Sequence, residues 1–469
     1  SEARLRGRLA RLAPESAAGP APRDWEAGQP AEIAFGDPPR PPRPEDDAAY
    51  RRAYRRVQHR LWGELFARDL TDFRAFRGMQ PLCAALAALG GDEPPVLVLT
   101  MDTDPVTGDE KDGYVQRVVA IDKALAPRPR IYLKMVAGRR GAPALAPLEP
   151  DIWRLEIAHR CEFGEAALAT LLGLGAPVYS QSLVGIDPPV VRRLLPRRTG
   201  PLLMDMHGAV PEEFVLYGNH FMAQKYAEHE AWAAREADTV VCVTEEMARH
   251  FARKLGIPPA RSIVCPVFLH ARTSDRRVEP YNDRPRAIYA GGTQRWQMIP
   301  ELAGLVSESR DWCDWVLLTG DVAGMRKELA RARVPAGAEA VSVRSASQAG
   351  VFATYPRCDF GLLLREEDVV NRVACPTKLV EYLRFGVVPV LATPHVGDFA
   401  EMGMRYLAVE DFRAGAVPDL DERAEMAEAN RRVFDRLLER SRNGQLRIAR
   451  AVRGRRGARP ARHELRSTA

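Results

Sequence analysis

The run from Arg365 to Glu381 carries side chains whose types and spacing suit recognition of an anionic ligand. It follows an apolar stretch, Asp359 to Leu364, that is typical of a buried strand, and a helix is predicted to begin within it. A helix that begins at the end of a buried strand forms an anion site, because its free backbone N–H groups and the positive end of its dipole face the crevice. Lys378, in the first turn, would meet a pyrophosphate, and Glu381 would accept hydrogen bonds from ribose hydroxyls. We therefore expect a sugar nucleotide here.

Both charged residues of this helix also have an ordinary explanation. Glu381 would normally be a solvated helix residue, but the helix is otherwise apolar and reads as buried, so the carboxylate needs a partner. Lys378 could be a surface lysine, yet a cation in the first turn opposes the helix dipole. Neutralisation of a phosphate would account for that unfavourable position.

A glycine pair and two arginines extend the predicted site. Gly291 and Gly292 follow a predicted strand, where the absence of side chains lets the backbone approach a ligand, although a tight turn is the alternative. Arg365 leaves the end of its own strand, and Arg295 follows the glycine pair; a solvated loop arginine is the alternative for Arg295. Either guanidinium would offset the charge that builds on a departing nucleoside diphosphate.

No Asp-x-Asp pair stands on a loop after a strand, which is the usual carboxylate arrangement for a divalent ion. We therefore expect cationic side chains in place of a metal, and no cofactor besides the nucleotide-sugar substrate. The seven cysteines are scattered, without Cys-x-x-Cys and without neighbouring histidines, which predicts free thiols and no structural zinc.

A second group of polar residues lies earlier in the chain. Asp205 and His207 follow the apolar segment 202–204, so we expect both to emerge at the C-terminal end of a strand and to face a cleft. The imidazole would hydrogen-bond sugar hydroxyls or the acceptor, and a purely structural pairing with Asp205 is the alternative. The acid-rich loop from Asp102 to Gly113 lacks the EF-hand order and is expected to admit the acceptor.

The order of apolar segments predicts an α/β protein. With 469 residues, the chain is expected to form two globular domains with extensions. Strands are expected at 95–100, 130–133, 178–182, 202–204 and 239–243, with helical segments between them, and again at 286–290, 315–319, 340–343, 359–364 and 388–392. This alternation is typical of two Rossmann-like, doubly wound domains. The predicted bounds are a Pro/Ala/Arg-rich linker at 1–45, a helical extension at 46–92, an acceptor domain at 93–280, a donor domain at 281–415, and a helix (422–441) with a basic tail at 416–469.

Composition predicts a soluble or peripheral cytoplasmic protein. No stretch approaches the roughly 20 apolar residues that span a bilayer, and no charged-then-apolar leader begins the sequence. The net charge is +6, with arginines concentrated from Arg440 onward. Such a tail is usually solvated; the alternative is contact of the basic termini with anionic lipid at the inner face of the cell membrane. No nucleic-acid partner is expected.

Taken together, several motifs resemble a known enzyme family. The donor-side motifs are Tyr289-Ala290-Gly291-Gly292, Trp296-Gln297, the strand ending in Arg365, Asn371, Pro376-Thr377-Lys378-Leu379-Val380-Glu381-Tyr382-Leu383, Gly386 and Pro389-Val390-Leu391. The acceptor-side motifs are Asp205-Met206-His207-Gly208 and the segment 237–244. Over residues 93 to about 415, the chain resembles GT-B glycosyltransferases of family 4.

The resemblance implies a retaining transfer of a hexose or deoxyhexose to a glycan or lipid-linked glycan, in bacterial surface polysaccharide synthesis. The donor would be a UDP-, GDP- or dTDP-sugar, and its binding residues would include Asn371, Pro376 and Thr377. Leaving-group stabilisation would fall to Arg365, Arg295 and Lys378.

In one position the sequence departs from the family. The family usually carries a second glutamate eight residues before the ribose-binding one, and Val373 stands there. Arg365 and Asn371 would then hold the transferred sugar, as in a branch of the family with an Arg…Asn…Pro-Thr-Lys arrangement.

The sequence leaves three alternatives to glycosyl transfer. A GT-B epimerase or hydrolase would act on the sugar nucleotide alone. A binding or scaffold module would keep the fold after losing catalysis with the missing glutamate. A dehydrogenase fits least, because neither half shows Gly-x-Gly-x-x-Gly after its first strand.

Overall fold

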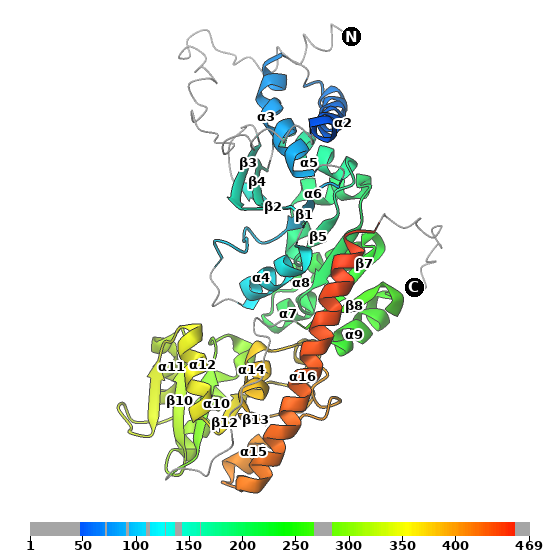
Figure 1. Cartoon of the computed structure of the whole chain (residues 1–469). Helices are drawn as coiled ribbons and strands as arrows, with labels where there is room; N and C mark the ends of the chain where they lie inside the picture. The colour runs from blue at the N-terminus through cyan, green and yellow to red at the C-terminus, as the bar shows by residue number, and fades with distance from the viewer. Residues whose placement is uncertain are drawn as a thin grey trace, which may run out of the picture. The chain divides into compact units, whose positions relative to one another are not determined.

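The computed structural model describes residues 47–70, 73–90, 93–108, 113–126, 128–136, 143–159, 161–266 and 284–454 (Figure 1). The predicted linker at 1–45 and the end of the predicted basic tail lie outside these residues. The chain divides into two compact units. The first holds the described residues up to Val106, Leu125–Leu203 and those from Ala451 on; the second holds Thr107–Ala124 and Met204–Arg450. The second unit thus contains the predicted donor domain together with part of the predicted acceptor domain. This division differs from the predicted domain bounds, which stay a prediction.

In the first unit, two helices precede a parallel sheet. Helices α2 (Asp47–Phe66) and α3 (Phe73–Gly90) form the predicted helical extension, and both lie near α5 (Glu162–Gly173) (Figure 1). The buried residues of α2 recur at a spacing of four, as an amphipathic helix requires: Ala53, Val57, Leu61 and Leu65. Strand β1 (Val96–Leu99) pairs in parallel with β2 (Arg130–Val136) and β5 (Val178–Ser180).

A hairpin lies where only helical segments were expected between residues 133 and 178. Strands β3 (Ala144–Glu149) and β4 (Ile152–Ala158) pair antiparallel, and β4 also pairs in parallel with β2. Three residues of β4 are buried: Ile152, Leu155 and Ile157. The last two are two positions apart and so lie on the same face of the strand. Asp151, in the turn before β4, has a left-handed backbone conformation. Strand β3 contains Pro147, and a proline normally argues against a strand because it has no N–H group to donate. The strand tolerates it because β3 lies at the edge of the sheet.

The first sheet has eight strands in the order β3-β4-β2-β1-β5-β6-β7-β8. Its later strands are β6 (Leu202–Met206), β7 (Thr239–Cys242) and β8 (Ser262–Val264); β8 was not predicted. The accompanying helices of the second unit are α4 (Gly113–Leu125), α7 (Val210–Leu216), α8 (His220–Glu236) and α9 (Glu245–Leu255).

The second sheet lies wholly in the second unit and is parallel in every recorded pairing. Its strands are β9 (Arg286–Ala290), β10 (Asp314–Leu318), β11 (Val341–Arg344), β12 (Phe360–Leu363), β13 (Val388–Leu391) and the unpredicted β14 (Leu407–Ala408). The order β11-β10-β9-β12-β13-β14 is that of a doubly wound domain, which confirms the predicted fold class. The strand order reverses between β9 and β12, and in such sheets ligands bind beyond the carboxyl ends of the strands at that point.

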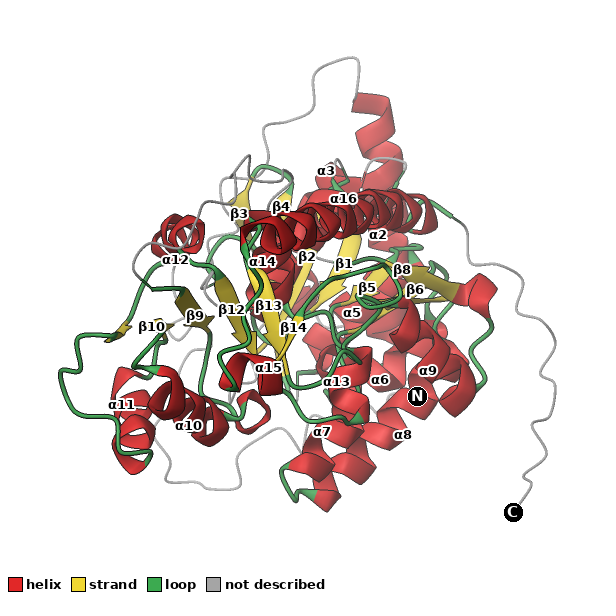
Figure 2. Ribbon diagram, turned by 90° about the horizontal axis from the view of Figure 1, so that it is seen from below, coloured by secondary structure: helices red, strands yellow, loops and turns green. Residues whose placement is uncertain are grey.

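Helices cover both faces of this second sheet (Figure 2). Helices α10 (Ile299–Ser309), α11 (Val322–Arg331) and α15 (Val409–Arg413) pack on one face around the buried Trp315 and Phe360. Helices α12 (Gln348–Thr354) and α14 (Thr377–Phe385) pack on the other around Ile288 and Leu363. The two cores hold the ends of β9 and β12 in place.

The last helix, α16 (Leu420–Ala451), is longer than the predicted 422–441. The arginine-rich segment from residue 440 to 451 is therefore helical, because Ser441, Gly444 and Ile448 continue a buried stripe along one face of the helix. The helix returns to the first sheet as expected: the Arg447 guanidinium donates to the carbonyl of Ser262. Gly444 lies so close to β8 that a Cβ there would be 2.6 Å from the carbonyl oxygen of Val264.

Among the described residues, no helix is long and apolar enough to cross a membrane. Within the same residues, no three His, Cys, Asp or Glu side chains gather in a way that could hold a metal ion. All seven cysteines are free, and six of them are buried.

Candidate functional site

Helix α14 begins where the sequence predicts it, after β12 and a short helix, α13 (Val369–Val373). Its N-cap is Pro376, whose side chain makes no hydrogen bond to the first turn. The first backbone N–H groups of the helix are thus left to a ligand or to water. Gly386 ends the helix in a left-handed conformation, with a φ of 65° that favours glycine.

Lys378 is buried in the first turn of α14, with a side chain held by neutral groups. Its Nζ donates to Oε1 of Gln297 at 2.8 Å and lies 4.1 Å from the ring centre of Tyr289. Burial, together with the nearby charge of Arg365, holds the pKa of Lys378 well below its usual value, against the weaker pull of Glu381. A bound anion would raise this pKa again, because an opposite charge favours the protonated amine.

Glu381 has the partner that its apolar surroundings required. Tyr355, in a short 3-10 helix after α12, donates its hydroxyl to Oε2 of Glu381 at 2.6 Å. Burial raises the pKa of Glu381, and the Tyr355 hydrogen bond opposes that shift. One carboxylate oxygen is thereby fixed, and Glu381 still lines the larger of two cavities described below.

Arg365 and Asn371 are brought together, but only Arg365 faces a cavity. The Arg365 Nη1 donates to Oδ1 of Asn371 at 2.9 Å, and Arg365 lines both cavities. The Asn371 amide nitrogen donates to the Glu366 carbonyl and to Asp368, and Asn371 is fully buried. The sugar-binding expectation for Asn371 therefore does not fit, because its oxygen and both amide hydrogens are already used within the chain.

Burial lowers the pKa of Arg365 to about 10. The guanidinium stays protonated at neutral pH, and its Nε is buried without a hydrogen-bond partner among the described residues. An unpaired buried donor is costly, and an acidic ligand would satisfy it.

The glycine pair lies as predicted, at the end of β9. Gly291 lines the larger cavity, and a Cβ there would be 2.6 Å from Nζ of Lys378, so glycine makes room for the amine. Gly292 lines the same cavity, and its carbonyl accepts a hydrogen bond from Tyr289. Arg295, by contrast, is exposed and lines neither cavity, so the leaving-group role expected for it does not fit its position.

Asp205 does not emerge from its strand as expected. It lies inside β6, fully buried, and accepts from Arg117 Nη2 at 2.6 Å and from Arg117 Nε at 2.9 Å. Burial alone would raise the pKa of Asp205, but the charges of Arg117 and His207 outweigh it and hold that pKa at about 2. Asp205 therefore has a structural role: its carboxylate holds the Arg117 guanidinium in place.

His207 lies just after β6 and lines the smaller cavity. Its Nε2 is 3.5 Å from Oδ2 of Asp205, and its ring centre lies 5.1 Å from that of Tyr114. Burial lowers the pKa of His207, and the charge of Asp205 opposes that shift. The ring is therefore neutral at pH 7 and able to hydrogen-bond a hydroxyl.

Two neighbouring cavities in the second unit gather most of these residues. The smaller, of about 420 Å³, contains His207 and Arg117; the larger, of about 610 Å³, contains the glycine pair, Lys378 and Glu381. Five residues line both: Gly113, Trp296, Arg365, Pro376 and Thr377. The two cavities therefore meet at the start of α14 and at the Arg365 guanidinium.

Three cavity residues have no local sequence signal that would have marked them. Tyr114 and Glu213 line the smaller cavity, and Phe352 lines the larger. Glu213 lies in the first turn of α7, where an acidic residue is common because it interacts favourably with the positive end of the helix dipole. Of the predicted acceptor loop, Gly113 lines both cavities, Asp104 pairs with Arg154 at 2.6 Å, and Asp109 and Asp112 lie outside the described residues.

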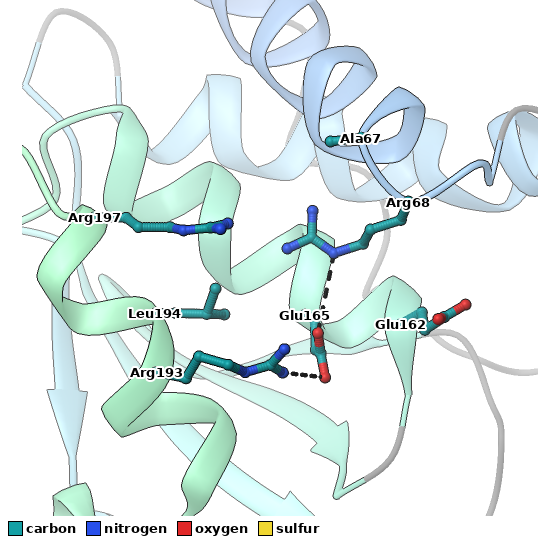
Figure 3. Close-up of a pocket in the computed structure, with 7 residues that line it drawn as sticks. All are labelled: Ala67, Arg68, Glu162, Glu165, Arg193, Leu194 and Arg197. Atoms are coloured by element: carbon teal, nitrogen blue, oxygen red, sulfur yellow. Dashed lines mark ion pairs between the residues drawn. The ribbon is translucent and has the colours of Figure 1, made fainter.

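A further pocket, of about 280 Å³, lies in the first unit, where residues just after α2, residues of α5 and the segment 193–197 line it (Figure 3). Its main cations already have partners: Arg193 lies 2.6 Å from Glu165, and Arg68 lies 2.7 Å from Glu64. None of the residues predicted for the site lies there.

The comparisons with known proteins agree with this architecture. Residues 186–269 match the model of Glycosyltransferase Family 4. No protein of curated function matches the chain by sequence.

Solved structures match the fold along most of the chain. One is described as trehalose-6-phosphate from E. coli bound with UDP-2-fluoro glucose; at 12% identity it covers 77% of this chain and 99% of its own, with a TM-score of 0.53. HepE of Anabaena, in complex with UDP-glucose, has 11% identity, coverages of 76% and 99%, and a TM-score of 0.54. An α,α-trehalose-phosphate synthase (UDP-forming) from Burkholderia vietnamiensis has 14% identity, coverages of 76% and 98%, and a TM-score of 0.51.

At these identities the solved structures establish the fold alone, and the family match at residues 186–269 adds the enzyme class. The matched range includes four residues that line the smaller cavity: His207, Gly208, Glu213 and Val243. The chain has the fold of GT-B glycosyltransferases, and its residues 186–269 are similar to Glycosyltransferase Family 4.

Proposed function

We propose that the protein is a retaining glycosyltransferase that moves a hexose or deoxyhexose from a nucleotide sugar to a glycan or lipid-linked glycan. The observation that carries this proposal is the junction of two cavities at the uncapped start of α14 and the Arg365 guanidinium. A nucleotide sugar has the same layout, with a diphosphate between two larger neutral groups.

The larger cavity is the proposed nucleoside site. Glu381 would accept hydrogen bonds from the ribose, the backbone at Gly291 and Gly292 would approach the nucleotide, and Lys378 would face the diphosphate. HepE and the E. coli structure hold UDP-sugars on the same fold, which favours a UDP-linked donor over a GDP- or dTDP-linked one.

The proposed chemistry is a displacement on one face of the sugar. A bond forms between the acceptor oxygen and the anomeric carbon while the bond to the β-phosphate oxygen breaks, and the acceptor proton passes to that leaving oxygen. Arg365, Lys378 and the start of α14 would stabilise the negative charge on the leaving group, without a metal or a cofactor. His207 would hydrogen-bond a hydroxyl in the smaller cavity.

The proposed setting is bacterial surface polysaccharide synthesis in the cytoplasm, with the basic termini in contact with the inner face of the membrane. The support for this setting is compositional: the arginine-rich C-terminal segment and the arginines near residue 1.

A panel of UDP-, GDP-, dTDP- and ADP-sugars tests the donor site by thermal stabilisation. One class should stabilise the protein, because a ligand at a hundred times its dissociation constant adds about 2.7 kcal/mol. In calorimetry, Glu381→Ala should weaken binding of the matching nucleoside diphosphate at least tenfold, or about 1.4 kcal/mol.

Lys327→Met, which removes an exposed cation on α11, is the matched control and should bind as the wild type does. Unchanged affinity in Glu381→Ala would refute the ribose assignment. If no sugar nucleotide binds, the chain is a scaffold module instead; nucleotide release without any glycan would indicate an epimerase or hydrolase.

A further inference from the structure

We propose that Glu213 recognises the hydroxyl groups of the transferred sugar, and that it selects neutral hexosyl donors against hexuronosyl donors. This inference rests on the proposed function, since it assigns the sugar to the smaller cavity. It replaces the expectation that Arg365 and Asn371 hold the sugar where the family has a second glutamate.

Position 373, which usually carries that glutamate, cannot contribute to the cavity in this chain. Val373 is 1% exposed and lines neither cavity. Its carbonyl accepts a hydrogen bond from the Thr244 hydroxyl at 2.8 Å, which fixes the end of α13 against the start of α9. The oxygen and both amide hydrogens of Asn371 are also used within the chain, so the charged group that the segment after β12 supplies to the smaller cavity is Arg365.

The carboxylate of the smaller cavity comes from α7 instead. Glu213 lines this cavity together with His207 and Arg365. No hydrogen bond to its carboxylate is made by any residue that the structure describes. Gly208 leaves space for it, because a Cβ at that position would lie 2.3 Å from Oε1 of Glu213. A carboxylate in a cavity with open acceptor sites is suited to sugar hydroxyls, which are donors.

The charges around this carboxylate favour a neutral sugar. Arg117 is paired with Asp205, and burial lowers the pKa of His207, so Arg365 is the cation that faces Glu213 across the cavity. Burial raises the pKa of Glu213, and the charge of Arg365 opposes that shift and favours the carboxylate. That guanidinium is also the group that meets the diphosphate at the junction of the cavities. A second carboxylate on the sugar would face Glu213 without a cation of its own, and like charges in a buried site repel strongly.

The test compares the affinities of UDP, UDP-glucose and UDP-glucuronate, measured by calorimetry on the full chain. The wild type should bind UDP-glucose at least tenfold more tightly than UDP-glucuronate. In Glu213→Gln the two donors should bind within about threefold of each other, with UDP itself bound as in the wild type.

A second variant, Gly208→Ala, should act in the same direction, because the added methyl group displaces the Glu213 carboxylate. Glu301→Gln, an exposed position on α10, is the matched control and should keep the wild-type ratio. A thermal unfolding curve for each variant separates lost folding from lost recognition.

Equal binding of both donors by the wild type, or an unchanged ratio in Glu213→Gln, overturns the role of Glu213 while leaving the nucleotide site intact. Failure of the wild type to bind UDP in any form overturns the UDP-linked donor and this inference together.

Discussion

At the residue scale, the amine of Lys378 is the group most sensitive to a bound phosphate. In the structure it is held by Gln297 and by the ring of Tyr289, and its pKa lies well below the usual value because of burial and the charge of Arg365. A diphosphate beside it would raise that pKa, since an opposite charge favours the protonated form. Binding should therefore be coupled to uptake of a proton.

The sign of this coupling gives a testable pH dependence. Between the lowered pKa of the free site and the higher pKa of the complex, the complex holds more protons, so affinity for UDP should fall as the pH rises through that window. Calorimetry in two buffers of different ionisation enthalpy should detect the proton uptake directly. In Lys378→Met both the uptake and this part of the pH dependence should vanish.

Lys327→Met, on the exposed side of α11, should retain both effects. Proton uptake of the same size in Lys378→Met would show that another group takes the proton.

At the element scale, α9 is anchored by two caps from different parts of the second unit. The Thr244 side chain accepts from the backbone of Met247, as an N-cap residue does. Asp398, far along the chain, accepts from the backbone N–H groups of Glu245 at 2.6 Å and Glu246 at 2.8 Å. Arg440 of α16 donates to the same carboxylate at 2.9 Å.

Asp398→Ala should consequently lower the free energy of unfolding by about 1–2 kcal/mol, because two backbone donors lose their acceptor at once. Urea denaturation followed by circular dichroism would measure the loss. Asp435→Ala, on an exposed position of α16, is the control and should stay within about 0.5 kcal/mol of the wild type. Equal stability of both variants would mean that Thr244 caps the helix alone.

Elements with local signals were predictable from the sequence, and the remaining ones were not. Five of the six strands of the second sheet, β9 to β13, lie within a residue or two of expectation, because apolar segments between helical segments mark parallel strands. The β3–β4 hairpin was missed since Pro147 belongs to an edge strand, and the end of α16 was missed since arginines on its exposed face hid the buried stripe.

The residues of the candidate site also fall into two groups, those that the sequence predicts and those that only the folded structure reveals. Lys378, Glu381 and Gly291 follow from a helix start and strand ends, which are local features. Glu213 and Tyr355 reach the site from helices that only the folded chain brings near, so no spacing rule marks them. Arg295 was wrongly placed because closeness in sequence to the glycine pair does not fix the direction of a long side chain.

At the scale of the whole molecule, catalysis is expected to proceed without a divalent ion. The junction of the cavities already offers the Arg365 guanidinium, the Lys378 amine and the start of α14 to a leaving diphosphate. Turnover should therefore be unchanged by EDTA, as measured by nucleotide release in the presence of acceptor. Loss of activity under chelation, with recovery on adding magnesium or manganese, would contradict this expectation.

The length of α16 also has a consequence for synthesis. Val433, Phe434 and Leu437 of this helix belong to the core on one face of the second sheet, and Met426 belongs to the core on the other. These residues are translated after every strand that the structure describes, so each core stays incomplete until α16 has been synthesised. A chain that stops before residue 426 would release a finished set of strands with uncovered apolar faces, a substrate for chaperones and proteases rather than a shortened enzyme.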